Sequence, residues 1–133
     1  MNDRKGLIST YAHGIIDYVV GVALLFAPNI FGFASLGGAP DIIPRFMGIA
    51  IIAMALLTQY ELGLFKLIPF KAHKTIDIIA GLYLALSPFI HGFASEPANA
   101  WVPHLIVGVA IIAVAFMSQT KPASRSLLRR AYS

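Results

Sequence analysis

The segment AHGIIDYVVGVALLFAPNIFGFAS at residues 12–35 decides the fold, because it returns in altered form as AHKTIDIIAGLYLALSPFIHGFAS at residues 72–95. The similarity extends without a gap over residues 12–59 and 72–119, where 19 of 48 aligned positions are identical at an offset of 60 residues. A fixed offset of this length indicates an internal duplication. We therefore expect two copies of one unit, repeat one at 12–59 and repeat two at 72–119.

Composition places these repeats in a membrane. The chain has 133 residues, of which 58% are hydrophobic and only 12% are charged, whereas a soluble domain carries about 25% charged residues. The same hydrophobicity excludes intrinsic disorder. A helix needs about 20 apolar residues to cross the hydrocarbon core, and two such stretches occur in each repeat. The expected spans are residues 15–33, 42–60, 75–93 and 101–119.

The repeats predict an all-α integral membrane four-helix bundle that forms a single domain over residues 1–133. Each unit holds two spans, so the second unit enters the membrane from the same side as the first. The two-helix repeats should therefore be parallel and related by a pseudo-two-fold axis along the membrane normal. No alternating pattern of strands occurs in the sequence.

Basic residues indicate the orientation. Nine of the ten Lys and Arg residues fall in the tails or the middle loop, and only Arg45 falls on the other side. The positive-inside rule places both termini in the cytoplasm, with residues 120–133 as a basic cytoplasmic tail. We expect a bacterial cytoplasmic membrane protein whose net charge of +4 reflects this topology and not binding of nucleic acid. The absence of cysteine excludes disulfides and thiolate chemistry.

Small and turn-forming residues recur at equivalent positions of the first helix of each repeat. Glycine without side-chain bulk permits close helix approach, a proline near the helix end bends or ends the helix, and a second glycine fits the turn that follows. These positions are Gly21, Pro28 and Gly32 in repeat one and Gly81, Pro88 and Gly92 in repeat two.

The stretch LALSPFIHGFA at residues 84–94 resembles the SPW repeat family of small membrane proteins. That family is built from two-helix repeats with a Ser-Pro-Trp motif in the first helix. Here Ser87-Pro88-Phe89 keeps the first two residues, and the weaker copy Ala27-Pro28-Asn29 keeps only the proline. The resemblance covers about residues 12–119. It implies the duplicated architecture, but it implies no activity, cofactor, partner or catalytic residue.

Two His/Asp pairs form the main polar constellation. His13 with Asp17, and His73 with Asp77, are spaced i,i+4, so the two side chains of each pair can touch on a helix. Ionisable residues inside a span are costly and often functional. If the first helices of the repeats meet, the four side chains could hold a zinc ion, ligate a haem or pass protons. The interpretation that we favour is that each pair anchors a helix end within reach of water, with each His paired to its own Asp.

The remaining polar residues are interpreted as structural. His91 and His104 are expected at the surface of the outer interface, and Tyr60 is expected among the aromatic residues of the membrane boundary. Gln59 and Gln119 are expected to hydrogen-bond between helices. No elbow with Ser-His-Asp order, phosphate loop or HExxH motif occurs in the sequence.

These observations favour a structural or interaction subunit that packs with itself or with a larger membrane assembly. The alternative is an ion or proton channel or transporter component that uses the repeated His/Asp pairs. Enzymatic activity is not indicated, and no cofactor or metal is assigned. The expected partners are the lipid bilayer and a second copy or another membrane protein.

Overall fold

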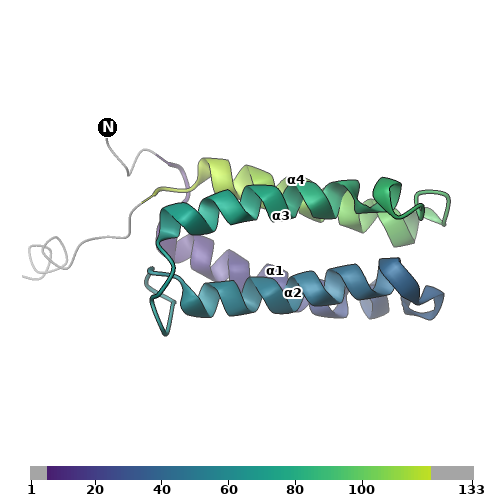
Figure 1. Cartoon of the computed structure of the whole chain (residues 1–133), viewed down its shortest axis with the longest axis horizontal. Coiled ribbons are helices and arrows are strands. Elements are labelled where there is room, and N and C mark those ends of the chain that lie inside the picture. Colours follow the sequence, from purple (N-terminus) through teal and green to yellow (C-terminus); the bar gives the residue numbers. More distant parts are fainter. Residues whose placement is uncertain (1–5, 121–133) are drawn as a thin grey trace, which may run out of the picture.

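Four long helices make up the computed structural model, which describes residues 6–120 (Figure 1). They are α1 (Thr10–Ile30), α2 (Gly38–Leu57), α3 (Phe70–Ile90) and α4 (Ala98–Met117), with the short 3-10 helix η1 (Ala34–Leu36) between α1 and α2. The predicted all-α bundle is confirmed, and residues 6–120 form no named strand. Of the tail expected at residues 120–133, everything beyond residue 120 lies outside the described residues.

Every helix begins earlier than its predicted span. The sequence predicts the first and third spans at residues 15–33 and 75–93, but α1 begins at Thr10 and α3 at Phe70. The difference arises because an apolar stretch marks the hydrocarbon core, whereas a helix continues into the polar boundary. At α1 this extension has a local cause, since the Ser9 side chain accepts a hydrogen bond of 3.1 Å from the Ala12 backbone N–H and thereby caps the helix.

The helices pair in sequence order. Figure 1 shows four helices aligned along the long axis, with α1 beside α2 and α3 beside α4, and these two pairs also have the most extensive contacts. The α1–α2 and α3–α4 connections lie at one end of the bundle, which we call the turn end. The α2–α3 connection, residues 58–69, lies at the opposite end, which we call the loop end.

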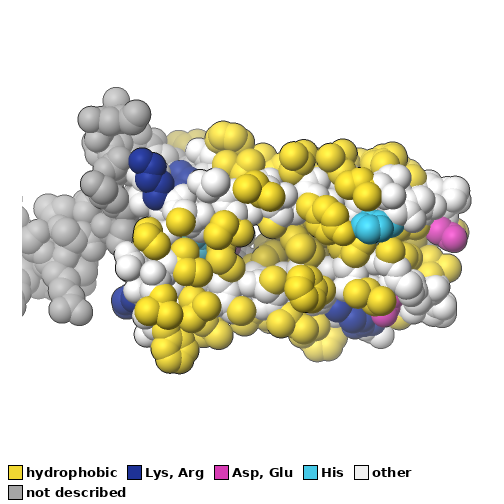
Figure 2. All heavy atoms as spheres, in the orientation of Figure 1, with side chains coloured by type: hydrophobic (Ala, Val, Ile, Leu, Met, Phe, Trp, Pro, Cys, Tyr) yellow, Lys and Arg dark blue, Asp and Glu magenta, His cyan; other side chains and the backbone are white. Residues whose placement is uncertain are grey.

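Three helices, α1, α2 and α4, are long and apolar enough to cross a membrane. Helix α3 is equally long at 21 residues, but Lys71, Lys74 and Asp77 lie in its first turns and lower its mean hydropathy. Hydrophobic side chains cover most of the face drawn in Figure 2, and the charged side chains visible there lie toward the ends. This distribution is that of a protein surrounded by lipid.

Glycines set the helix separation within each pair. A Cβ atom built on Gly108 would lie 2.5 Å from the Gly81 carbonyl oxygen, and one built on Gly81 would lie 2.7 Å from the Gly108 oxygen. Gly21 and Gly48 face each other in the same way between α1 and α2. The two pairs therefore pack backbone to backbone through equivalent residues, as the duplication predicts. The two-fold rotation between the repeats stays a prediction.

The turn end is built from two equivalent helix terminations. Gly32 and Gly92 adopt positive φ angles of 76° and 74°, which glycine tolerates at no steric cost. The Phe33 N–H then donates to the Pro28 oxygen at 2.9 Å, and the corresponding bond in repeat two measures 2.8 Å. This six-residue closure is a Schellman motif, so α1 and α3 each end two residues after their proline.

The prediction that His104 lies at the surface is wrong. Its side chain is only 2% exposed and packs against the rings of Phe33 and Phe93, with centroid distances of 5.7 and 4.8 Å. The two Schellman turns direct both phenylalanines inward, and these rings cover the histidine. His91, in contrast, is exposed as expected and lies 2.7 Å from the Tyr83 hydroxyl.

Candidate functional site

Four ionisable side chains from α1 and α3 meet at the loop end. His13 and Asp17 lie in the first two turns of α1, and His73 and Asp77 lie at the equivalent positions of α3. One ligand atom from each of the four residues lies within 4.8 Å of all the others. We call these four residues the His/Asp cluster.

Each histidine contacts both aspartates. Within a repeat, His13 Nε2 lies 3.2 Å from Asp17 Oδ1, and His73 Nε2 lies 3.1 Å from Asp77 Oδ2. Between repeats, His13 Nε2 lies 3.0 Å from Asp77 Oδ2, and His73 Nε2 lies 3.2 Å from Asp17 Oδ2. The i,i+4 spacing accounts for the contacts within each repeat, whereas the crossed contacts are made by side chains that reach between α1 and α3.

The cluster is buried. His13 and His73 are 0% and 1% exposed, and Asp17 and Asp77 are 6% and 8% exposed. The Phe70 ring covers the histidines, with centroid distances of 4.9 Å to His13 and 5.5 Å to His73. This burial does not fit the access to water that the anchoring interpretation assumes.

Two hydroxyl groups hold the outer nitrogens of the histidines. His13 Nδ1 lies 2.6 Å from Ser118 Oγ, and His73 Nδ1 lies 2.6 Å from Thr58 Oγ1. Ser118 and Thr58 follow the last residues of α4 and α2, so each histidine is positioned by the hydroxyl of the opposite repeat. Each imidazole is therefore held at Nδ1 by a hydroxyl and turns Nε2 toward the aspartates, and Nε2 of His73 makes no hydrogen bond of good geometry.

Tyr60 completes the cluster from the 58–69 connection. Its hydroxyl donates to Asp17 Oδ2 at 2.9 Å, and its side chain is only 1% exposed. The prediction that Tyr60 belongs to the aromatic residues of the membrane boundary is therefore wrong, because the connection folds back over the bundle end. Burial, and then the negative charge of Asp17, raise the pKa of Tyr60, so its phenol remains a hydrogen-bond donor.

Comparison with known families gives a match that spans most of the chain. The SPW repeat domain matches residues 11–118, a range that contains both helix pairs and all four residues of the His/Asp cluster. The chain belongs to the SPW repeat family. No curated protein and no solved structure matches the chain.

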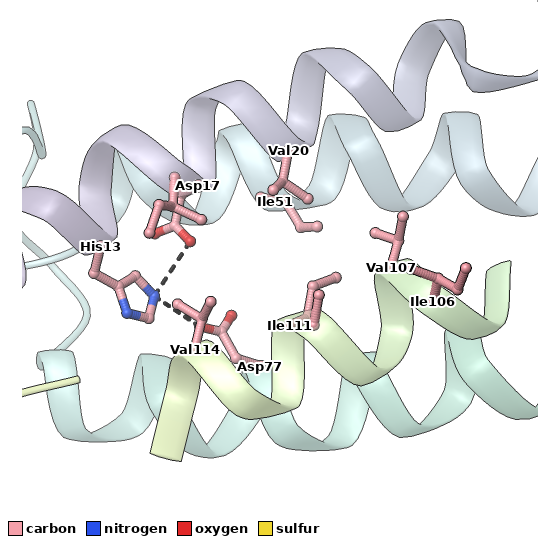
Figure 3. A pocket seen from close by; sticks show the side chains of 11 residues that line it. His13, Asp17, Val20, Ile51, Asp77, Ile106, Val107, Ile111 and Val114 are labelled. Atoms are coloured by element: carbon pink, nitrogen blue, oxygen red, sulfur yellow. Dashed lines mark hydrogen bonds and ion pairs between the residues drawn. The ribbon is translucent and has the colours of Figure 1, made fainter. Parts of the chain in front are cut away.

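A cavity adjoins the cluster in this SPW repeat protein. It has a volume of about 170 Å³ and lies among α1, α2, α3 and α4. Figure 3 shows His13 between Asp17 and Asp77 at one end of the cavity, with branched aliphatic side chains along the remainder. Val20, Ile51 and Ile111 are among these apolar residues. The cavity therefore joins an apolar space to a polar end.

The SPW repeat protein thus presents two imidazoles and two carboxylates to one point. This set could hold a cation through nitrogen and oxygen ligands, or it could exchange protons between histidine and aspartate. Either role uses the ring nitrogens of the two histidines and the carboxylate oxygens of the two aspartates. Each histidine has an Nε2 atom within 3.0 to 3.2 Å of both aspartates.

Sequence reasoning missed Thr58, Ser118 and Tyr60 as partners of the cluster. The signal for the first two was present, because Thr58 and Ser118 occupy equivalent positions of the two repeats and both carry a hydroxyl. The sequence instead predicts contacts between helices for the adjacent pair, Gln59 and Gln119. In the structure the Gln119 side chain donates to the Gly6 carbonyl oxygen at 3.2 Å, which is a contact to the N-terminal segment and not between helices.

Proposed function

We propose that this protein is a structural or interaction subunit of the cytoplasmic membrane, whose two helix pairs are held together by the His/Asp cluster. The observation that carries the proposal is the pair of crossed contacts, His13 with Asp77 and His73 with Asp17. Each joins one repeat to the other through buried polar groups. Breaking such a contact strands a buried ionisable group, which is far more costly than losing an apolar contact.

The outer surface of the bundle supports an interaction role. All four helices present large apolar side chains, including one repeat-equivalent position on each helix. These side chains are Val19 at 62% exposed, Ile49 at 56%, Ile79 at 65% and Val109 at 53%. In a bilayer such residues contact either lipid or another protein, and the proposal is that one of these faces contacts a protein.

Cysteine cross-linking tests the assembly. The chain has no cysteine, so Val19→Cys, Ile49→Cys, Ile79→Cys and Val109→Cys each introduce a single thiol. We expect one helix, or two adjoining helices, to give cross-linked species in intact membranes, while the other positions give none. The cysteine-free wild type is the control. If none of the four variants gave more cross-linked product than the wild type, whatever the mass of that product, the assembly role would be contradicted.

Orientation in the membrane forms part of the same proposal. Both termini and the 58–69 connection are assigned to the cytoplasm, on the distribution of basic residues. Reporter fusions after Gly38 and after Asn99 should therefore report the outside, and a fusion after Gly63 should report the cytoplasm. A cytoplasmic signal at either of the first two positions contradicts the assignment.

Ion or proton movement is the second candidate function. The specific observation in its favour is the cavity of about 170 Å³ that ends at His13, Asp17 and Asp77. Reconstituted liposomes with a pH-sensitive dye test it: a flux that is lost in Asp17→Asn and retained in Asp41→Asn supports this function. A rate equal to that of empty liposomes removes it and leaves the structural role.

A further inference from the structure

The hydrogen atoms around the cluster determine which form its histidines take. The Thr58 hydroxyl lies 2.6 Å from the Met54 carbonyl oxygen and 2.6 Å from His73 Nδ1. A carbonyl oxygen can only accept a hydrogen bond, so the single hydroxyl hydrogen is donated to Met54. The hydroxyl oxygen must then accept from His73, and the Nδ1 atom of His73 carries a hydrogen.

The same reasoning applies in the other half of the bundle. The Ser118 hydroxyl donates to the Val114 carbonyl oxygen at 2.6 Å and lies 2.6 Å from His13 Nδ1. His13 is therefore also protonated at Nδ1. Both histidines consequently turn Nε2 toward the aspartates, in the same tautomer and through equivalent residues of the two repeats.

In this tautomer, no positive charge balances the two carboxylates at the centre of the cluster. A neutral imidazole with its hydrogen on Nδ1 presents a lone pair at Nε2. Four contacts of 3.0 to 3.2 Å then join nitrogen lone pairs to carboxylate oxygens, and these atoms repel one another unless a positive charge lies between them. Either an additional proton on each Nε2 or one cation supplies that charge.

We propose that the His/Asp cluster binds one divalent transition-metal ion of the zinc type, through Nε2 of His13 and His73 and one oxygen each of Asp17 and Asp77. A divalent ion neutralises two carboxylates while both imidazoles stay neutral, so the buried site carries no net charge. Imidazole nitrogen with carboxylate oxygen suits zinc. Magnesium and calcium prefer ligand sets made of oxygen alone.

The four ligand atoms lie close enough together to converge on one ion. Zinc bonds of about 2.0 to 2.1 Å in a tetrahedron separate neighbouring ligand atoms by about 3.3 to 3.4 Å. The four nitrogen–oxygen separations in the cluster are 3.0 to 3.2 Å. These separations involve both oxygens of Asp17, and one ligand atom from each of the four residues lies within 4.8 Å of all the others. Binding of zinc would therefore shorten the longest separation by up to about 1.5 Å, beside a cavity that His13, Asp17 and Asp77 help to line.

The outer partners of the cluster fit the same role. Histidines that bind metals usually donate their second ring N–H to a fixed acceptor, and ligating carboxylates usually accept a further hydrogen bond. Thr58 and Ser118 accept from the two histidines, and Tyr60 donates to Asp17. These three residues hold the ligand atoms in place before any ion is bound.

Zinc titration of the full-length protein in detergent tests the proposal. After treatment with a chelator, the wild type should bind one Zn²⁺ per chain by calorimetry and elemental analysis, and Mg²⁺ should not bind. In Asp77→Asn the affinity should fall by more than about tenfold, since even changes to outer partners reach that size. His91→Ala removes an exposed histidine and is the matched control, which should bind as the wild type does.

Two further measurements keep the test decisive if Asp77→Asn fails to fold. Thr58→Val leaves all four ligands in place and should weaken zinc binding about 10- to 100-fold. Co²⁺ in the wild type should give the intense visible absorption of a tetrahedral site. A wild type that binds no Zn²⁺, an Asp77→Asn variant that binds equally well, or an octahedral Co²⁺ spectrum would each overturn the metal site. None of these results bears on the cross-linking pattern, so failure of the metal site is distinguishable from failure of the assembly role.

Discussion

The two ends of the bundle both bury histidine, and they do so in different surroundings. At the loop end, His13 and His73 contact two carboxylates and two hydroxyls. At the turn end, His104 lies between two phenylalanine rings and neither of its ring nitrogens makes a hydrogen bond, whereas at the loop end His73 Nε2 alone makes none. The histidines are buried to nearly the same extent at both ends, so burial does not distinguish a candidate functional site from a packed core. The two ends differ in the groups that contact the ring nitrogens.

Loss of a carboxylate from the loop end should have the largest effect. Asp77→Ala removes two of the four His–Asp contacts and leaves a buried polar group without compensation, which costs about 3 to 5 kcal/mol. Thermal or denaturant unfolding in detergent measures this change. Asp41→Ala is the control at the turn end, where the ion pair with Arg45 is partly exposed and worth about 1 kcal/mol or less. If the two substitutions lowered the free energy of unfolding equally, the two ends would not differ in this respect.

Tyr60→Phe should cost about 1.5 to 3 kcal/mol at neutral pH, the usual value of a hydrogen bond to a charged group. The effect should also depend on pH. Because the pKa of Tyr60 is raised in the folded protein, its stabilisation is fully present below the unfolded pKa of about 10. Above that pH it should decline by about 1.4 kcal/mol per pH unit, since only the unfolded state loses the phenolic proton. Unfolding curves of wild type and variant between pH 8 and 12 should converge, and parallel curves would contradict the raised pKa.

Thr58→Val should cost about 1 to 3 kcal/mol, because the Nδ1–H of His73 loses its acceptor while remaining buried. Ser118→Ala should have a similar effect on His13. Ser87→Ala provides a comparison near the turn end, where the buried hydroxyl donates only to the Leu84 carbonyl oxygen of its own helix. Nitrogen-15 NMR of the histidines adds a direct readout, since His13 and His73 should both be protonated at Nδ1. Signals for the opposite tautomer would refute the hydrogen-bond assignment.

His104→Leu should have the smallest effect, and its sign is informative. The substitution replaces a ring that makes no hydrogen bond with an apolar side chain, so stability should be unchanged or should rise slightly. Melting temperature in detergent is the measurement, with His73→Leu as the destabilised counterpart. A loss of more than about 1 kcal/mol in His104→Leu would mean that this histidine has a polar partner after all.

The duplication explains why much of the fold could be predicted from sequence. Residues that recur at an offset of 60, such as Gly21 with Gly81 and Gly32 with Gly92, take equivalent roles at helix contacts and turns. The apolar stretches predict that the four helices exist, but they do not predict the residues at which the helices begin and end. Ser9 and Phe70 lie outside the apolar stretches and yet flank or begin a helix, because backbone hydrogen bonding continues beyond the hydrocarbon boundary.

The candidate site was less accessible to sequence reasoning. The i,i+4 pairs could be recognised locally, but the crossed contacts depend on how α1 meets α3. Tyr60 gave no repeat signal, since its equivalent position is Thr120. His104 likewise aligns with Pro44, and its burial depends on two phenylalanines that the turns direct inward. Tyr60 and His104 depend on the path of a connection, whereas Thr58 and Ser118 carried a repeat signal at the helix ends.

The crossed contacts have a consequence for how the two repeats assemble. His13 with Asp77 and His73 with Asp17 are contacts that two separate helix pairs could make equally well. In this chain the 58–69 connection tethers the pairs, so their association is intramolecular and governed by an effective concentration. Formation of the cluster therefore does not depend on the concentration of the protein in the membrane. Lengthening or cutting that connection would make the same contacts available to a neighbouring molecule, through exchange of helix pairs.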